Sequence, residues 1–214
     1  FLKTIGWPDP GAAAPLRRMS KLCIAAERAG LRTKPPTEPV GLAEIQACLS
    51  VVDVSDKLEV SAIAAMLVLY DTMSREDAIF GHREGRIWHA TPPSLLDLRR
   101  LPDGTGRLRM RTAARDVGYQ DAALTPLTMS WLDRAIAGRQ RDGSDPLFLS
   151  QRGYGWELTG WRRTVTRILK RANLVERGVS GRSLRVGKAL DLARAGTPLP
   201  DIQRAGYWST LRRV

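Results

Sequence analysis

The spacing of hydrophobic residues along this chain is mostly that of helices. Apolar side chains recur every three or four positions, which places them on one face of a helix. This pattern predicts helices at Ala14–Ala29, Gly41–Val51, Leu58–Thr72, Pro126–Ala137 and Thr159–Ala172. The segment Leu58–Thr72 is apolar almost throughout, so we expect it to be a central, buried helix.

A small part of the chain shows the alternation of strands instead. Leu108 and Met110 alternate with arginines in Arg107–Arg111, after the turn-forming residues Pro102–Gly106. A second strand is predicted within Asp116–Leu124. His82 and His89 have no metal-ligand or catalytic-triad spacing, and we interpret Phe80–Pro93 as a surface loop. The predicted fold class is α+β, mainly α-helical, with a small antiparallel β-sheet.

The segment Ser180–Trp208 predicts two helices joined by a tight turn. Arg182, Arg185 and Lys188 are spaced by three residues along the first helix, opposite an apolar side that includes Leu184 and Ala189. Gly196 is placed to end this helix, Pro198 and Pro200 interrupt it, and a second helix is predicted at Asp201–Ala205, before Gly206. By itself, a basic stripe on an amphipathic helix is typical of a solvated face.

Composition adds a class of partner. The 214 residues include 34 Lys and Arg against 22 Asp and Glu, a formal net charge of +12 that favours binding to a polyanion, above all nucleic acid. Aromatic residues make up only 6%, which favours a duplex over a single strand stacked on aromatic rings. Cys23 and Cys48 have no metal-site spacing, and the longest apolar stretch, Val60–Tyr70, is too short to cross a bilayer. We therefore expect a soluble cytoplasmic protein with no metal and no membrane partner.

Two segments resemble the signature boxes of a known family. Ser180–Trp208 contains R-V-G, D-x-A-R-A-G, P-x-I and A-G-x-W in that order and without a gap, and Leu69–Arg75 places an arginine just after an apolar helix. This pattern is similar to the tyrosine recombinase (phage integrase) family. The resemblance implies the catalytic-domain fold of that family and site-specific DNA recombination or integration. It also implies cleavage and rejoining through a 3′-phosphotyrosine intermediate, without metal or other cofactor.

The resemblance also implies roles for individual residues. Arg75, Arg182, Arg185 and Trp208 match catalytic positions of the family. The helix Thr159–Ala172 matches a DNA-contacting helix that follows a short strand, here Asp145–Leu149, and its basic residues are Arg162, Arg163, Arg167, Lys170 and Arg171. The implied partner is double-stranded DNA, bound by a homo-tetramer of the full-length protein.

Domain boundaries follow from the resemblance and from the Pro-rich segment near residue 35. Residues 1–34 resemble the last helix of a core-binding domain, residues 35–39 form a linker, and residues 40–214 form the catalytic-like domain. The chain begins with Phe1 rather than Met, which suggests a fragment. The nucleophilic tyrosine of the family is expected beyond Val214.

Three departures from the family pattern leave the enzymatic activity open. Arg182 stands where the family usually has histidine, no lysine lies in Thr112–Asp116, and Ala78 stands where an acidic residue is usual. Arginine donates hydrogen bonds but does not shuttle protons near neutral pH. The chain is then a recombinase tolerant of these changes, an engineered or truncated protein, or a non-catalytic DNA-binding paralogue with an accessory or regulatory role. A basic RNA-binding protein is a further alternative, for which Arg75, Arg185 and Trp208 would have no reason to converge.

Overall fold

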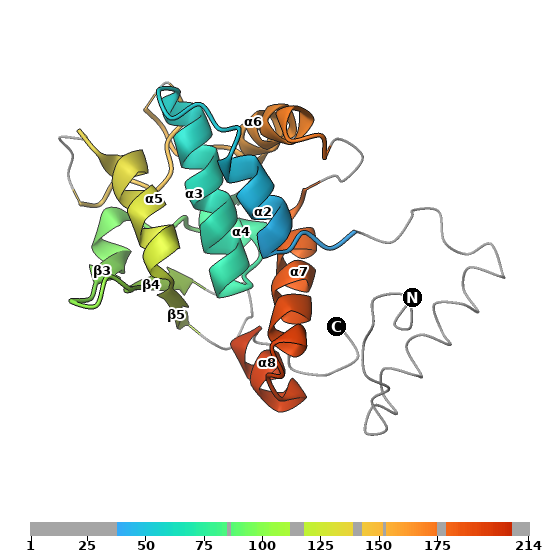
Figure 1. The fold of residues 1–214 in the computed structure, drawn as a ribbon. Helices are drawn as coiled ribbons and strands as arrows, with labels where there is room; N and C mark the ends of the chain where they lie inside the picture. Colours follow the sequence, from blue (N-terminus) through green and yellow to red (C-terminus); the bar gives the residue numbers. More distant parts are fainter. Residues whose placement is uncertain are drawn as a thin grey trace, which may run out of the picture.

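The structure, a computed structural model, describes residues 38–84, 87–111, 118–138, 143–151, 153–174 and 179–206. The helices are α2 (Leu42–Leu49), α3 (Lys57–Thr72), α4 (Glu76–Phe80), α5 (Pro126–Ile136), α6 (Leu158–Arg171), α7 (Gly181–Arg194) and α8 (Leu199–Ala205), with a short 3-10 turn, η1 (Leu95–Asp97). The strands are β1 (His82–Glu84), β2 (Ile87–Ala90), β3 (Leu98–Arg100), β4 (Gly106–Arg111) and β5 (Tyr119–Leu124). The predicted fold class is confirmed: the chain is mainly helical with a small antiparallel sheet (Figure 1).

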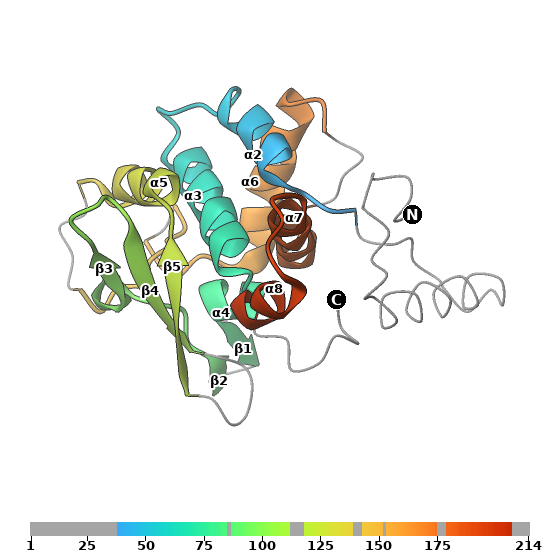
Figure 2. The same cartoon turned by 60° about the horizontal axis from the view of Figure 1, so that its bottom comes forward.

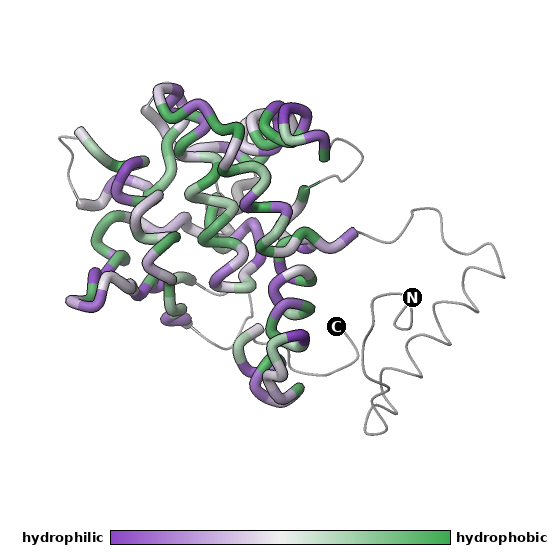
Figure 3. The backbone as a smooth tube through the Cα atoms, viewed as in Figure 1, coloured by the Kyte–Doolittle hydropathy of each residue, from purple (hydrophilic) through white to green (hydrophobic). Residues whose placement is uncertain are grey.

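Helix α3 is the centre of the fold. It contacts α2, α5, α6, α7 and β5, so every residue from Glu59 to Tyr70 is buried. Asp56 caps its first turn by accepting a hydrogen bond from the Leu58 backbone N–H at 2.8 Å. Figure 3 shows the largely hydrophobic course of this helix through the middle of the molecule. The prediction of a central buried helix at Leu58–Thr72 is confirmed.

Strands β3, β4 and β5 form an antiparallel sheet in that order, with β5 packed against α3 (Figure 2). Side chains alternate as the pleat requires: Leu108, Met110, Ala122 and Leu124 are buried, whereas Arg107, Arg109 and Asp121 are exposed. The two predicted strands therefore form, with β3 as a third strand at the edge.

The prediction that Phe80–Pro93 is a surface loop is partly wrong. Its backbone forms an antiparallel hairpin in which Arg83 lies opposite Trp88 and Glu84 opposite Ile87. The apolar residues Ile87 and Trp88 favour a strand, and the strand is too short for its alternation to be recognised in the sequence. Conversely, Asp145–Leu149 does not form a named strand. It contributes only single-residue bridges, at Pro146 and at Leu149, because proline lacks the N–H that would extend a ladder.

Helices α7 and α8 form the predicted pair. Ser180 caps α7 by accepting from the Ser183 N–H at 3.2 Å, and Gly196, with φ of 82°, lies just after its end. Helix α8 begins at Leu199, two residues before the predicted start. Pro200 lies in its first turn, where a missing N–H costs no helical hydrogen bond, so proline did not delay the helix as expected.

Helix α7 is joined closely to the first described residues of the chain. The Val40 N–H donates to the Ser183 carbonyl at 3.0 Å, and the Leu42 N–H donates to Asp191 Oδ2 at 2.8 Å. Tyr70 on α3 donates its hydroxyl to the same Asp191 oxygen at 2.7 Å, and burial together with the Asp191 carboxylate raises the pKa of Tyr70. Between these contacts, a Cβ at Gly187 would lie 1.9 Å from the Val40 carbonyl oxygen. We call this contact region the Val40–α7 seam.

Substitution of Gly187 by alanine is expected to destabilise the protein by about 2 to 3 kcal/mol, because the added methyl group forces two backbone segments apart. Helix propensity alone would favour alanine at this position by up to about 1 kcal/mol. A net loss of stability can therefore be attributed to the steric clash. The measurement is the urea midpoint of both variants, with Gly118→Ala as a control, since nothing lies within 4 Å of a Cβ there. Equal midpoints for the two variants would contradict the prediction.

Some predictions lie outside the described residues. These are the helix Ala14–Ala29, most of the linker, the segment Thr112–Asp116, Trp208, and hence the boundary between residues 1–34 and 40–214. Across the part of the chain that is described, no helix has the length and apolar character needed to cross a membrane.

Candidate functional site

Arg75 is presented by a sharp turn at the end of α3. Met73 has a left-handed backbone, with φ of 46°, and the Thr72 hydroxyl donates to the Val68 carbonyl at 2.7 Å. The Ser74 N–H in turn donates to the Thr72 hydroxyl oxygen at 3.3 Å. Arg75 then takes the N-cap position of α4, with its side chain exposed. This turn fixes the place from which the Arg75 guanidinium projects.

The end of α3 is anchored by Asp71. Its nearly buried carboxylate accepts hydrogen bonds from the Thr125 N–H at 2.8 Å and from the Thr128 hydroxyl at 2.5 Å. Lys188 Nζ lies 3.6 Å from the other Asp71 oxygen and 4.5 Å from the centre of the Tyr70 ring. Lys188, which continues the basic stripe of α7, therefore contacts α3. Through Asp71, the helices α3, α5 and α7 are joined just before Arg75.

Glu76 links the turn of Arg75 to two other helices. Its carboxylate accepts from the Gly181 N–H at 2.8 Å, at the N-terminus of α7, and from Arg162 on α6 at 2.6 Å. A negative charge at a helix N-terminus is favourable. A Cβ at Gly181 would lie 2.6 Å from Glu76 Cγ, so glycine there allows the close approach. Ala78 stands three positions after Arg75, where an acidic residue was expected. Glu76, directly after Arg75, instead connects the first signature segment to the start of the second, at Gly181.

Arg185 and Arg75 lie close together although they are far apart in the chain. Burial and the nearby charge of Arg75 lower the pKa of Arg185 to about 10, so the Arg185 guanidinium remains charged at neutral pH. Arg185 is half-buried and donates a hydrogen bond to the Gly206 carbonyl, which ties α7 to the end of α8. Arg182 is exposed one turn earlier on α7. Within the described residues, no carboxylate pairs with Arg75 or Arg182.

Helix α6 is divided into an apolar and a basic side, as its sequence predicts. Val165, Ile168 and Leu169 are buried, and Trp161, fully buried, donates its indole N–H to the Ala62 carbonyl of α3 at 3.2 Å. The opposite side is exposed and forms an open groove lined by Arg162, Arg163, Thr166, Arg167 and Lys170. Arg163 and Lys170 have no ion pair within the described part of the chain.

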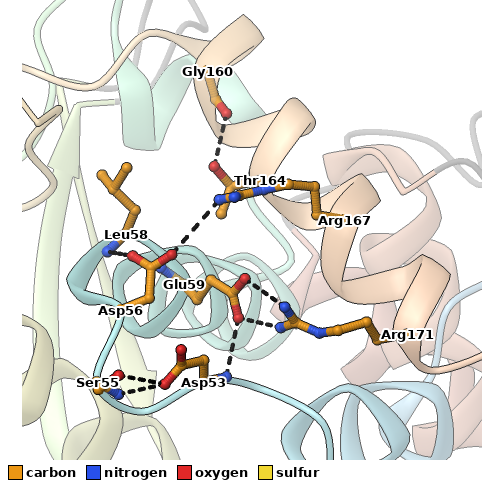
Figure 4. A network of polar contacts seen from close by, with 9 residues as sticks. All are labelled: Asp53, Ser55, Asp56, Leu58, Glu59, Gly160, Thr164, Arg167 and Arg171. Atoms are coloured by element: carbon orange, nitrogen blue, oxygen red, sulfur yellow. Dashed lines mark hydrogen bonds and ion pairs between the residues drawn. The ribbon is translucent and has the colours of Figure 1, made fainter.

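The other basic residues of α6 have protein partners, and Figure 4 shows those of Arg167 and Arg171. Arg171 binds the buried Glu59 with two guanidinium nitrogens, and the Asp53 N–H donates to the same carboxylate at 3.0 Å. Burial alone would raise the pKa of Glu59, but the hydrogen bonds from Arg171 and Asp53 outweigh it, so the pKa is lowered. Arg167 lies 3.8 Å from Asp56, a loose ion pair, and Arg162 contacts Glu76. These pairs hold α6 against the start of α3 and against α4.

Other chemistry finds little support among the described residues. No group of three His, Cys, Asp or Glu side chains in those ranges could hold a metal ion. Cys48 is fully buried, and burial followed by the nearby Glu44 charge raises its pKa to about 11, which makes it a poor nucleophile.

Comparison with solved structures finds several similar folds. A XerH site-specific recombinase bound to difH substrate, in a pre-cleavage complex, is matched over 84% of this chain with a TM-score of 0.63 and 18% identity. XerA recombinase is matched over 91% of this chain, with a TM-score of 0.60 and 17% identity. This chain has the tyrosine recombinase fold.

A third structure with this recombinase fold is the Tn1549 transposon integrase in complex with circular intermediate DNA, matched over 83% of this chain at a TM-score of 0.55 and 19% identity. The matched region covers 49% of the XerH chain, 67% of XerA and 59% of the integrase, so this chain spans about half the length of the XerH structure. No protein-family model matches the sequence, and no curated protein does.

The structure thus brings together part of the predicted site. Arg75 and Arg185 are neighbours, Arg182 lies on the same helix as Arg185, and Trp208 falls outside the described residues. The sequence analysis did not single out Glu76, which links α4, α6 and α7. The sequence offered one signal for this role of Glu76. An acidic residue directly follows Arg75, and the second signature segment has a glycine, Gly181, at its start, which leaves room for it.

Proposed function

We propose that this chain is the catalytic domain of a site-specific tyrosine recombinase or integrase. In this proposal it binds duplex DNA and cleaves and rejoins it through a 3′-phosphotyrosine intermediate. The observation that carries the proposal is the pairing of Arg75 with Arg185. Burial and the charge of the exposed Arg75 disfavour the charged form of the half-buried Arg185, and an anion bound by both arginines would offset that repulsion.

A scissile phosphodiester is the anion that fits this pair. Cleavage builds negative charge on the two non-bridging oxygens, and planar guanidinium groups can donate paired, charge-assisted hydrogen bonds to them. We assign Arg75 and Arg185 to this clamp and Arg182 to a further donor on the same face. By resemblance, the indole N–H of Trp208 adds another donor, and the attacking tyrosine is expected beyond Val214. No metal or other cofactor is required by this chemistry.

The basic side of α6 is proposed to bind the DNA backbone. Arg163 and Lys170 face solvent without an ion pair in the described residues, and Arg167 has only a loose one, so these three are available to phosphates. Arg162 and Arg171, which bind Glu76 and Glu59, would contact DNA only at the expense of those pairs. By resemblance, the natural protein would act in the cytoplasm as a homo-tetramer on duplex DNA.

The alternative is a DNA-binding paralogue that does not cut. Arg182 replaces the usual histidine, and Thr112–Asp116 has no lysine, so two positions that handle protons in the family are changed. Such a protein would keep the basic α6 surface and the arginine pair, and it would serve as an accessory or regulatory factor.

A suicide substrate separates the two functions. The natural protein containing this sequence is incubated with a cognate duplex nicked near the cleavage site, and the products are run on a denaturing gel. A covalent protein–DNA band that disappears when the downstream tyrosine is changed to phenylalanine is the result expected for a recombinase. Salt-sensitive duplex binding with no covalent band at any pH between 6 and 9 would instead establish the paralogue.

A further inference from the structure

The outer face of the three-stranded sheet carries an arginine cluster that plays no part in the proposed site. Arg99 on β3 and Arg107 and Arg109 on β4 are exposed, and they point away from the buried face formed by Leu98, Leu108 and Met110. We call Arg99, Arg107 and Arg109, together with Tyr119 on β5, the sheet arginine face. Asp121, opposite Arg109, is the acidic residue on this face among the described strands.

The arrangement of charges on this face is unfavourable for the isolated protein. Arg99 and Arg107 are direct cross-strand partners, and like charges directly opposite each other destabilise a sheet. No carboxylate of the described residues forms an ion pair with either of them. The neighbouring Arg100, which points to the other side of β3, does have such a partner, because it binds Asp133 of α5 at 2.6 Å. Arg99 and Arg107 are thus left without an acidic ion-pair partner among the described residues.

The third arginine is held in place by an aromatic ring. The Arg109 guanidinium carbon lies 4.1 Å from the centre of the Tyr119 ring, and Tyr119 is 57% exposed. Stacking on a ring orients a guanidinium group without consuming its hydrogen-bond donors. This contact favours an orientation in which Arg109 keeps its donors free for a ligand, although Asp121 lies opposite it on β5.

The location of the sheet arginine face sets it apart from α6. Helix α3 packs against β5 and also against α6, and both views place the sheet and α6 on different sides of α3 (Figures 1 and 2). A short duplex lying on the basic side of α6 would not cover the outer face of the sheet. The two basic surfaces are separate.

We propose that the sheet arginine face is a second DNA-binding surface, which holds the phosphate backbone of a duplex segment other than the one bound at α6. The occupant follows from charge complementarity: closely spaced phosphates supply the counter-charge that Arg99 and Arg107 lack, and guanidinium groups match phosphate oxygens. Contacts to phosphates alone carry no sequence preference, so this surface binds any duplex sequence. The inference rests on the proposed function, because it presumes that α6 binds DNA.

The stoichiometry of binding to a short duplex tests the proposal. A duplex of about 12 base pairs, roughly 40 Å long, is titrated into this chain at low salt and followed by sedimentation velocity. We expect two duplexes per chain for the unaltered protein and one for the triple variant Arg99→Gln/Arg107→Gln/Arg109→Gln. The matched control Arg134→Gln/Arg194→Gln/Arg204→Gln removes the same charge from α5, α7 and α8 and is expected to bind two.

The salt dependence of binding to a long duplex gives a second readout. The slope of log K against log salt concentration falls by about 0.9 for each phosphate that the protein no longer neutralises, so the triple variant is expected to have a slope smaller by about 2 to 3. The urea midpoint of this variant should be unchanged or higher, because the repulsion between Arg99 and Arg107 is removed. A smaller slope with an intact fold therefore shows that these arginines neutralise phosphates in the complex.

The outcomes also separate this inference from the proposed function. The double variant Arg163→Ala/Lys170→Ala removes exposed charge from α6. The second surface is wrong if the α6 double variant loses a bound duplex while the sheet triple variant still binds two. It is also wrong if the unaltered chain binds only one duplex and the α6 double variant loses it. In both cases DNA binding at α6 stands. If the unaltered chain binds no duplex at all, the proposed function fails, and this inference fails with it.

Discussion

Arg185→Ala is expected to lower the rate of covalent DNA attachment by the natural protein about 100- to 1,000-fold, the effect of removing one preorganised donor from a developing oxyanion. Half-burial makes Arg185 the better placed of the two paired arginines, because water screens its charge less than that of the exposed Arg75. The rate is measured under single-turnover conditions with the nicked suicide substrate, so that product release does not enter.

A lysine variant separates chemistry from folding in this experiment. Arg185 also donates to the Gly206 carbonyl, so alanine removes a contact between α7 and α8 with a cost of about 1 kcal/mol. Arg185→Lys keeps the positive charge but removes the planar, paired donors, and we expect it to bind duplex DNA normally and still to attach slowly. A lysine variant that attaches at the unaltered rate would show that Arg185 supplies charge alone and would contradict the clamp.

Arg171→Ala is expected to destabilise the protein by about 3 kcal/mol at pH 7, because it leaves the Glu59 carboxylate buried without its cation. Glu59 is only 2% exposed, whereas the Arg171 side chain is 43% exposed. The reciprocal change, Glu59→Gln, should therefore cost less, since the freed guanidinium can turn into water. The urea midpoints of both variants measure the difference.

The pH dependence of these variants provides a sharper test. In the unaltered protein the pKa of Glu59 is lowered, so its stabilising contribution is present above its ordinary pKa of 4.5 and is lost as the pH falls through the lowered value. Without Arg171, burial dominates and the pKa of Glu59 rises above 4.5, so the folded state binds the proton more tightly than the unfolded state. The Arg171→Ala variant should then lose less stability at pH 5 than at pH 7. A loss that grows as the pH falls would contradict this account.

The sequence predicted those elements whose patterns are long and local. The apolar run of α3, the alternation in β4 and the divided faces of α6 each extend over enough residues for the period to be read. The hairpin β1–β2 was missed because three or four residues do not establish an alternation. The start of α8 was misplaced because prolines were taken as interruptions, although Pro200 is compatible with a first turn.

The candidate site was predictable only where a motif marks it. Arg75, Arg182 and Arg185 were located by their boxes, and the five basic residues of α6 by helical spacing. That Arg171 binds Glu59 and Arg162 binds Glu76 could not be foreseen, because each partner lies on a distant segment and no local pattern encodes such a pair. Glycines at 181 and 187 are similarly uninformative alone, since the backbone or side chain that approaches them comes from another part of the chain.

The Val40–α7 seam has a mechanical consequence. Its contacts occur at three points along α7, at Ser183, Gly187 and Asp191, and these points lie on both sides of Arg185 in the sequence. Residues 40–42 therefore lie along the helix that carries this arginine and contact it on both sides of Arg185 in the sequence. A displacement of residues 40–42 would therefore act on α7 through three contacts, and α7 is the helix that carries Arg185.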